Sequence, residues 1–436
     1  MATVRDRPIA RCDRRHYRGK MSNDAAGGLA PIPDGTSGRA TAEFAPLVRA
    51  FARTFGRRRG AGGALSVHLH GEPLLDIWTG SAGGTSPWTQ DTGSIIFSAT
   101  KGVTATVIHR LADRGLIDYA APVAEYWPEF GANGKDKITV RQTMTHSAGL
   151  SALAPIATGL ADVLDHELME QRLAAAKPDR LLGVPAYHAL TYGWLMAGLA
   201  RAVTGRSMGE LFRSEVAEPL GLEGIHLGLP PEHAQTTYAP LAGTHLKAIG
   251  NPLGALVLGR SHRIPGALGA ATRCLFLPGL ESILEGDAPP ILRTELGAGN
   301  GVCTASALAG MYGVLANDGV ADGKQYLGAR TIKAIRRIQT YRLDNALFYA
   351  PMLWRLGYHS LPMPGARAGF GHIGLGGSFG WAEPRLGLSV GFVHNRLSAA
   401  QLSYDQSAAF WLLPLVLNCL RATRRIPVEV PQEKAA

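Results

Sequence analysis

Hydrophobic residues recur at helical spacing through most of the chain and at strand spacing in two segments far apart in the sequence. Spacings of three and four residues predict helices at 43–55, 98–115, 138–146, 161–176, 191–203, 207–218, 304–317 and 404–419. Short apolar runs broken by a glycine turn predict a hairpin of strands at 62–70 and 73–79. Apolar residues alternating with glycines over 370–396 predict two or three further antiparallel strands, with a turn at 383–385.

Strands near both ends with helices between them predict an α+β fold. In such a fold one antiparallel sheet is built from both ends of the chain, flanked by helices, with a mainly helical lobe inserted. We expect a mobile basic tail (1–42), one domain (43–421) and a C-terminal tail (422–436). Within the domain, residues 43–121 and 299–421 would form the sheet lobe and 122–298 the helical lobe. The poor periodicity of 224–290 predicts irregular walls or a lid over a pocket.

Composition and charge are those of an ordinary globular protein. Of the 436 residues, 46% are hydrophobic and 18% are charged. Seven basic and two acidic residues in 1–20 supply half of the formal net charge of +10. Basic residues are not interleaved with aromatic ones along any segment, so we expect no nucleic-acid partner.

The sequence gives no sign of secretion, membrane spanning or metal binding. The first residues contain no apolar signal segment, and the densest apolar stretch, 411–420, is too short to cross a bilayer. We therefore expect a cytoplasmic protein without integral membrane contact, and Met21 is an alternative start. The four cysteines are scattered, which predicts reduced, buried thiols. His68 and His70 are explained by alternate strand positions, so neither a metal nor a cofactor is expected.

One short motif carries candidate chemistry, Ser98-Ala99-Thr100-Lys101 at the start of a predicted helix. Three residues apart on a helix, the hydroxyl and the amine lie on the same face. A serine hydroxyl needs a proton acceptor to attack a carbonyl, and a lysine serves once burial has made it neutral. Backbone N–H groups at the helix start suit a developing oxyanion. By itself, the motif is equally compatible with an exposed helix start.

Two later segments extend this motif, one of them at 185–198 (PAYHALTYGWLMAG) and the other at 370–378 (FGHIGLGGS). In this order, the three resemble the motifs of the serine β-lactamase and penicillin-binding-protein superfamily. The chain is most similar to the class C β-lactamase-like branch that includes the family VIII carboxylesterases. Residues 145–150 (THSAGL), 218–222 (EPLGL) and 300–301 (NG) add to the resemblance, which covers about 43–421.

The resemblance implies a role for each matching residue. Ser98 would be the acyl-forming nucleophile and Lys101 its proton acceptor or electrostatic tuner. Tyr187, its pKa lowered by the lysine, would act as a base and then protonate the leaving alcohol. The backbone N–H groups of Ser98 and Leu375 would form the oxyanion hole, with Leu375 following His372-Ile373-Gly374 on an edge strand.

Two departures from the family pattern indicate the substrate. Relatives that act on β-lactams or D-Ala peptides carry Tyr-x-Asn and Lys-Thr-Gly, where this chain has Ala189 and His372. An amide and a permanent cation are thereby lost, which weakens recognition of an anionic amide substrate. We therefore expect a serine carboxylesterase that acts on small neutral esters, with weak β-lactam hydrolysis as a side activity.

Other readings stay open. Residues 376–380 (GGSFG) match the G-x-S-x-G elbow of another hydrolase fold, but strand and turn residues follow Ser378 where a helix is required. An acyltransferase, a β-lactamase or a D-amino-acid peptidase would use the same acyl-enzyme, and an inactive member would serve as a binding or scaffold protein. The sequence leaves open the oligomeric state, the acyl-chain preference and whether Lys101 or Tyr187 is the resting base.

Overall fold

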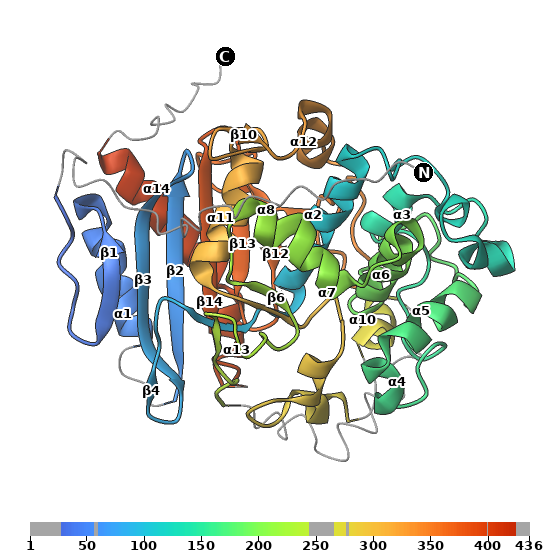
Figure 1. The fold of residues 1–436 in the computed structure, drawn as a ribbon, viewed down its shortest axis with the longest axis horizontal. Coiled ribbons are helices and arrows are strands. Elements are labelled where there is room, and N and C mark those ends of the chain that lie inside the picture. Colours follow the sequence, from blue (N-terminus) through green and yellow to red (C-terminus); the bar gives the residue numbers. More distant parts are fainter. Residues whose placement is uncertain (1–27, 56–59, 244–265, 276–278, 399, 424–436) are drawn as a thin grey trace, which may run out of the picture.

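A computed structural model describes residues 28–55, 60–243, 266–275, 279–398 and 400–423. Its main sheet has eight strands in the order β1-β3-β2-β14-β13-β12-β11, with β4 paired to β3, and all of these pairs are antiparallel (Figure 1). The strands are β1 (Thr36–Ala40), β2 (Gly62–Leu69), β3 (Glu72–Gly83), β4 (Ser86–Pro87), β11 (His359–Ser360), β12 (Phe370–Ile373), β13 (Phe379–Glu383) and β14 (Leu388–His394).

The sheet joins the two ends of the chain, as the sequence predicts. The N-terminal hairpin of β2 and β3 pairs through β2 with β14 from the C-terminal strands, with Val67 opposite Val390. The α+β class, the hairpin and the three C-terminal strands are therefore confirmed.

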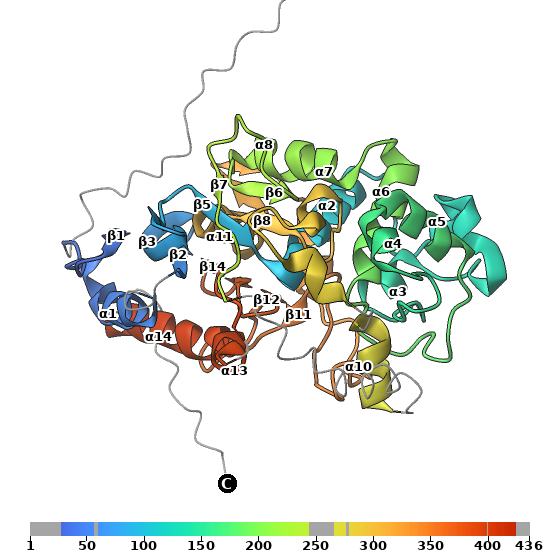
Figure 2. The same cartoon turned by 90° about the horizontal axis from the view of Figure 1, so that it is seen from below.

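Helices cover both faces of the sheet (Figure 2). On one face, α1 (Ala45–Phe55) and α14 (Ala408–Ala422) bury Phe51, Leu413 and their neighbours against strand residues such as Val67 and Trp381. On the other face lies α11 (Ala305–Ala316), of which ten residues are buried. A hydrophobic layer on each side of the sheet gives the site a rigid platform.

The helix that carries the S-x-x-K motif runs through the middle of the molecule. A 3-10 turn (Phe97–Ala99) leads into α2 (Thr100–Asp113), which is buried on every side from Thr100 to His109. A helix that is buried all round needs packing partners on every side. The sheet side and α11 supply them on one side and α6 (Thr191–Thr204) on the other.

A second, smaller sheet precedes this helix. Its order is β6-β8-β5-β7, formed by β5 (Thr92–Ile95), β6 (Ile225–Leu227), β7 (Thr237–Tyr238) and β8 (Gly301–Cys303). The sequence does not predict this sheet, because strands of two to four residues are too short to show a period. It fixes the approach to Ser98, since β5 ends three residues before it.

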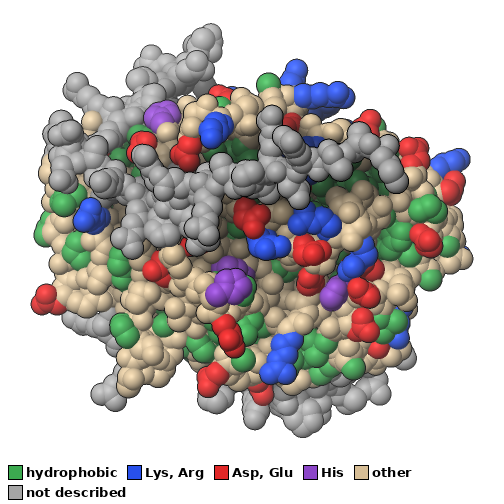
Figure 3. All heavy atoms as spheres, in the orientation of Figure 1, with side chains coloured by type: hydrophobic (Ala, Val, Ile, Leu, Met, Phe, Trp, Pro, Cys, Tyr) green, Lys and Arg blue, Asp and Glu red, His purple; other side chains and the backbone are tan. Residues whose placement is uncertain are grey.

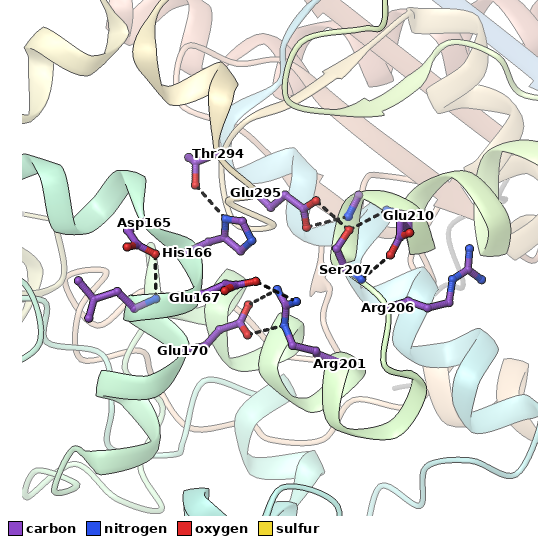
Figure 4. A network of polar contacts seen from close by, with 12 residues as sticks. Asp165, His166, Glu167, Glu170, Arg201, Arg206, Ser207, Glu210, Thr294 and Glu295 are labelled. Atoms are coloured by element: carbon purple, nitrogen blue, oxygen red, sulfur yellow. Dashed lines mark hydrogen bonds and ion pairs between the residues drawn. The ribbon is translucent and has the colours of Figure 1, made fainter.

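The helical lobe follows α2 in the sequence, and its first helices lie to the right in Figure 1. It contains α3 (Val140–Met144), α4 (Leu160–Leu164), α5 (His166–Ala175), α6, α7 (Met208–Leu211), a π-helical turn (Phe212–Ala217) and α8 (Glu218–Leu220). Figure 4 shows how polar contacts join these helices. Arg201 of α6 pairs with Glu170 at 3.0 Å and Glu167 at 3.3 Å on α5, and Ser207 donates to Glu295 at 2.8 Å.

Three sequence predictions need correction or lie outside the description. The basic tail does not extend to residue 42, because Thr36–Ala40 forms β1 and pairs with β3. The segment 224–290 is less irregular than expected, since it contributes β6, β7 and α10 (Ala267–Leu275). Residues 1–27, 244–265 and 424–436 lie outside the described part of the chain.

Two further features concern the helices and the surface charge of the described residues. None of their helices combines the length and apolar character needed to cross a bilayer. On the face drawn in Figure 3, basic and acidic side chains lie interspersed wherever the described residues are visible.

Candidate active site

Ser98 lies at the junction between β5 and α2. The preceding residue, Phe97, has a positive φ of 45° although its side chain is bulky and buried. Such a conformation is strained and persists only where the surroundings hold it. Here the turn points the Ser98 hydroxyl at the amine of Lys101, and the two atoms lie 3.1 Å apart.

The Lys101 amine is completely buried and has three neighbours. Besides Ser98 Oγ, its Nζ lies 2.7 Å from the carbonyl oxygen of Ala189 and 2.8 Å from that of Ala298. Burial holds the pKa of Lys101 well below its usual range. A neutral amine has two N–H bonds and one lone pair. In that neutral form the two carbonyls would accept the two N–H bonds, and the lone pair would face the Ser98 hydroxyl.

Tyr187 completes the group predicted from the sequence. Its hydroxyl and the Ser98 side chain form a hydrogen bond, and the Lys101 amine lies 4.8 Å from its ring centre. Burial raises the pKa of the Tyr187 phenol, and the hydrogen bond with Ser98 only partly opposes this effect. The expectation of a lowered tyrosine pKa is therefore wrong, because burial disfavours the charged phenolate more strongly than its neighbours favour it.

The turn after β12 brings the third motif to the nucleophile. A Cβ atom on Gly374 would lie 2.1 Å from the carbonyl oxygen of Ile96, so only glycine allows the turn to approach the chain just before Ser98. Leu375 follows in the turn and is 44% exposed. The sequence placed this residue on an edge strand. Instead, β12 ends at Ile373, and the short strand β11 pairs outside it.

His372 occupies the position of the family's lysine and is buried. Its Nδ1 donates to the carbonyl of Ile373 at 3.1 Å, and its Nε2 has no hydrogen-bond partner among the described residues. Burial is the main cause that holds the pKa of His372 well below its usual range. The imidazole is thus neutral at pH 7.

Three more neutral histidines lie around Ser98, Lys101 and Tyr187. The Nε2 of His359 accepts from the Ile373 N–H at 3.2 Å, and the Nε2 of His188 accepts from the Leu150 N–H at 3.3 Å. His146 Nδ1 accepts from the His188 N–H at 3.2 Å. Each acceptor nitrogen must be unprotonated, which is the form that burial favours. The histidines therefore form a polar wall without charge.

These histidines predict acid sensitivity of the fold. The pKa is lowered to about 4 for His68, His109, His188, His359 and His394, mainly by burial. Below about pH 6.5 these histidines bind protons in the unfolded chain, but in the folded protein they stay neutral until about pH 4. The free energy of unfolding therefore falls as the pH drops from 6.5 to 4. Buried carboxyl groups with raised pKa values, among them Asp76 and Glu170 at about 7, act in the opposite sense but are fewer than the histidines with lowered pKa values.

We expect the urea midpoint of unfolding to rise steadily from pH 5 to pH 7. His109→Gln should weaken this dependence, whereas His70→Asn at an exposed position should leave it unchanged. A midpoint that is flat or falls over this range would contradict the prediction.

Two alternatives weighed in the sequence are not supported by the geometry. Ser378 is followed by strand β13 rather than a helix, and its Oγ accepts from the backbone N–H of His394 at 3.3 Å. The nucleophile elbow is therefore rejected. His68 points its Nε2 at Ser66 Oγ, 3.1 Å away, and no group of three metal-binding side chains occurs in the described ranges.

Several residues that build the site carry no signal in the sequence. Asp344 and Trp354 pack around Tyr187, yet nothing in their spacing marks them. Asn300, part of a noted dipeptide, accepts from the Leu296 N–H and donates to the carbonyls of Ile291 and Thr294. These bonds shape the loop that presents the Ala298 carbonyl to Lys101.

Comparisons with known proteins show the family and the fold of the chain. The family model described as Beta-lactamase matches residues 47–409. The chain is 48% identical over 390 residues to Esterase/beta-lactamase LipL of Mycobacterium tuberculosis, covering 89% of each protein. The structure is similar to that of a penicillin-binding protein homologue from Caulobacter crescentus (TM-score 0.74, 31% identity) and to that of a family VIII carboxylesterase (TM-score 0.73, 30% identity). Both matches cover 88% of this chain and 100% of the other.

The chain belongs to the Beta-lactamase family. Its fold and relatives make it a serine hydrolase of the β-lactamase and penicillin-binding-protein type.

Proposed function

We propose that this protein hydrolyses neutral carboxylic esters through an acyl-enzyme on Ser98, with Lys101 as the general base. The observation that carries the proposal is the set of contacts around the buried amine. Two carbonyls occupy its N–H bonds, and its remaining neighbour is the Ser98 hydroxyl at 3.1 Å.

These contacts, together with Tyr187 beside Ser98, support the following order of proton transfers. Lys101 takes the Ser98 proton as Oγ attacks the ester carbonyl, and the new oxyanion accepts hydrogen bonds from the N–H groups of Ser98 and Leu375. As the intermediate collapses, the leaving alkoxide takes the Tyr187 proton, and the phenolate regains one from the Lys101 ammonium. Water then attacks the acyl group by the reverse sequence, releasing the acid and restoring Ser98.

The raised pKa of Tyr187 fits an acid rather than a resting base. A phenol that stays protonated at neutral pH holds a proton for the leaving alcohol, whereas a neutral lysine is ready to accept one. We therefore assign the resting base to Lys101.

The walls of the site favour a neutral ester. The side chain of Ala189 offers no amide, and its carbonyl is used by Lys101. His372 is buried and uncharged where a cation would bind a substrate carboxylate. An alkoxide also leaves more readily than an amide nitrogen, so hydrolysis of an ester needs less proton donation from Tyr187.

An activity panel tests the substrate class. We expect p-nitrophenyl acetate, butyrate and octanoate to be turned over at least about 100-fold more efficiently, in kcat/KM, than a cephalosporin, because roughly 3 kcal/mol of recognition is lost with the cation and amide. Equal or greater efficiency on the cephalosporin would contradict the proposal.

Slow β-lactam hydrolysis is a second candidate activity. LipL, the relative that is 48% identical, is named both esterase and β-lactamase. Measurable cephalosporin turnover that disappears in Ser98→Ala would establish it.

A further inference from the structure

One buried carboxylate beside the site plays no part in the steps above. Asp344 is fully buried and receives four N–H donors. Its Oδ1 accepts from the backbone of Tyr187 at 3.1 Å, Ala346 at 2.9 Å and Leu347 at 3.0 Å. Its Oδ2 accepts from the Trp354 indole at 2.9 Å.

These contacts require the ionised form of Asp344. All four neighbours are donors, so a proton on either carboxyl oxygen would meet an N–H group instead of an acceptor. Burial raises the pKa of the Asp344 carboxyl, while the four donors oppose that rise. A charged group is therefore held next to the backbone of Tyr187.

The same loop also holds the ring of Tyr187. Trp354 stacks on it with ring centres 5.7 Å apart and planes within 6° of parallel. Asn345 donates through its backbone at 2.9 Å and its side chain at 3.1 Å to the carbonyl of Pro185. Positive φ values of 53°, 59° and 48° at Phe348, Tyr349 and Leu353 mark a strained loop, as is common where surroundings fix a functional geometry.

We propose that Asp344 is a positioning residue for Tyr187, holding its backbone with one carboxylate oxygen and, with the other, the indole that stacks on its ring. The inference rests on the function proposed for Tyr187. It adds that the Tyr187 hydroxyl stays within reach of Ser98 only while the Asp344 carboxylate holds both the Tyr187 backbone and the Trp354 indole.

The charge of Asp344 provides a readout that a purely structural role would not change. Burial is the main cause that raises the pKa of Tyr187, and the negative charge of Asp344 adds to it. Removing this charge should make Tyr187 lose its proton at lower pH. The alkaline limb of the kcat profile, where the acid is lost, should therefore move to lower pH.

The test compares three variants with a matched control. Asp344→Asn should lower kcat at least tenfold with KM changed less than threefold, because an NH₂ group then opposes a donor whichever way the amide turns. Trp354→Phe should cost less, and the double variant should regain part of the loss of Asp344→Asn, since the indole N–H is gone. Trp381→Phe removes another fully buried indole, which donates to the Leu361 carbonyl at 3.0 Å in the core under α14, and should leave kcat and the pH profile unchanged.

Two results would overturn the inference. One is a pH profile and kcat of Asp344→Asn equal to those of the wild type. The other is a loss matched by Trp381→Phe, with no recovery in the double variant. Mass spectrometry keeps this test separate from the proposed function: a wild type that forms no acyl-Ser98 rejects that function, whereas a wild-type adduct with unaltered Asp344→Asn kinetics rejects the positioning role alone.

Discussion

Replacing Ser98 with alanine should lower kcat for p-nitrophenyl butyrate by at least about 10³-fold, since no other group in the described site can form the acyl intermediate. The fold should be retained, because Ser98 is only half-buried and its side-chain partners are Lys101 and Tyr187. Release of p-nitrophenol and the melting temperature measure the two parts of this expectation.

Ser378→Ala is the matched control for this experiment. Ser378 belongs to the competing G-x-S-x-G motif, and its Oγ accepts only a backbone N–H from the neighbouring strand. We expect this variant to keep most of the activity. If Ser378→Ala is inactive and Ser98→Ala is not, the assignment of the nucleophile is wrong.

Two substitutions of Lys101 distinguish a role as general base from a purely electrostatic role. Lys101→Met removes the amine at nearly constant length, and Lys101→Arg keeps a cation that cannot give up its proton. A base role predicts that both lose at least about 10³-fold in kcat. A purely electrostatic role predicts that Lys101→Arg keeps a substantial part of it. Retention of more than a tenth of the wild-type kcat by Lys101→Arg would contradict the base role.

The stability of Lys101→Met serves as the internal control. The methionine avoids the cost of burying an amine but leaves the Ala189 and Ala298 carbonyls without a donor, at about 1–3 kcal/mol each. The two effects oppose each other, so we expect a melting temperature within about 5 °C of the wild type. Loss of activity in a folded variant then reports chemistry.

Long periodic segments predicted most of the architecture. The predicted ranges 43–55, 191–203 and 304–317 correspond to α1, α6 and α11, and the predicted hairpin to β2 and β3. The pattern did not predict β1, because Thr36–Ala40 contains a serine and a glycine and no alternation of apolar residues. It missed the small sheet because β6 and β8, three residues each, are held by pairing with distant strands rather than by their own pattern.

In the site, the side chains could be predicted from the sequence and the backbone groups could not. Ser98, Lys101 and Tyr187 belong to motifs, and the structure brings them together. The carbonyls of Ala189 and Ala298 accept hydrogen bonds from the Lys101 amine, yet backbone groups leave no trace in residue identity. The direction of the Tyr187 pKa shift depends on burial, which a motif does not specify.

The proposed mechanism requires an uncharged Lys101 to remove the proton of Ser98. Labelling with a neutral fluorophosphonate ester, mapped by peptide mass spectrometry across pH, tests it most directly. We expect an adduct on Ser98 that forms faster as pH rises through the pKa of Lys101 and fails to form in Lys101→Met. An adduct on Ser378, or labelling of Ser98 at the same rate without the amine, would contradict it.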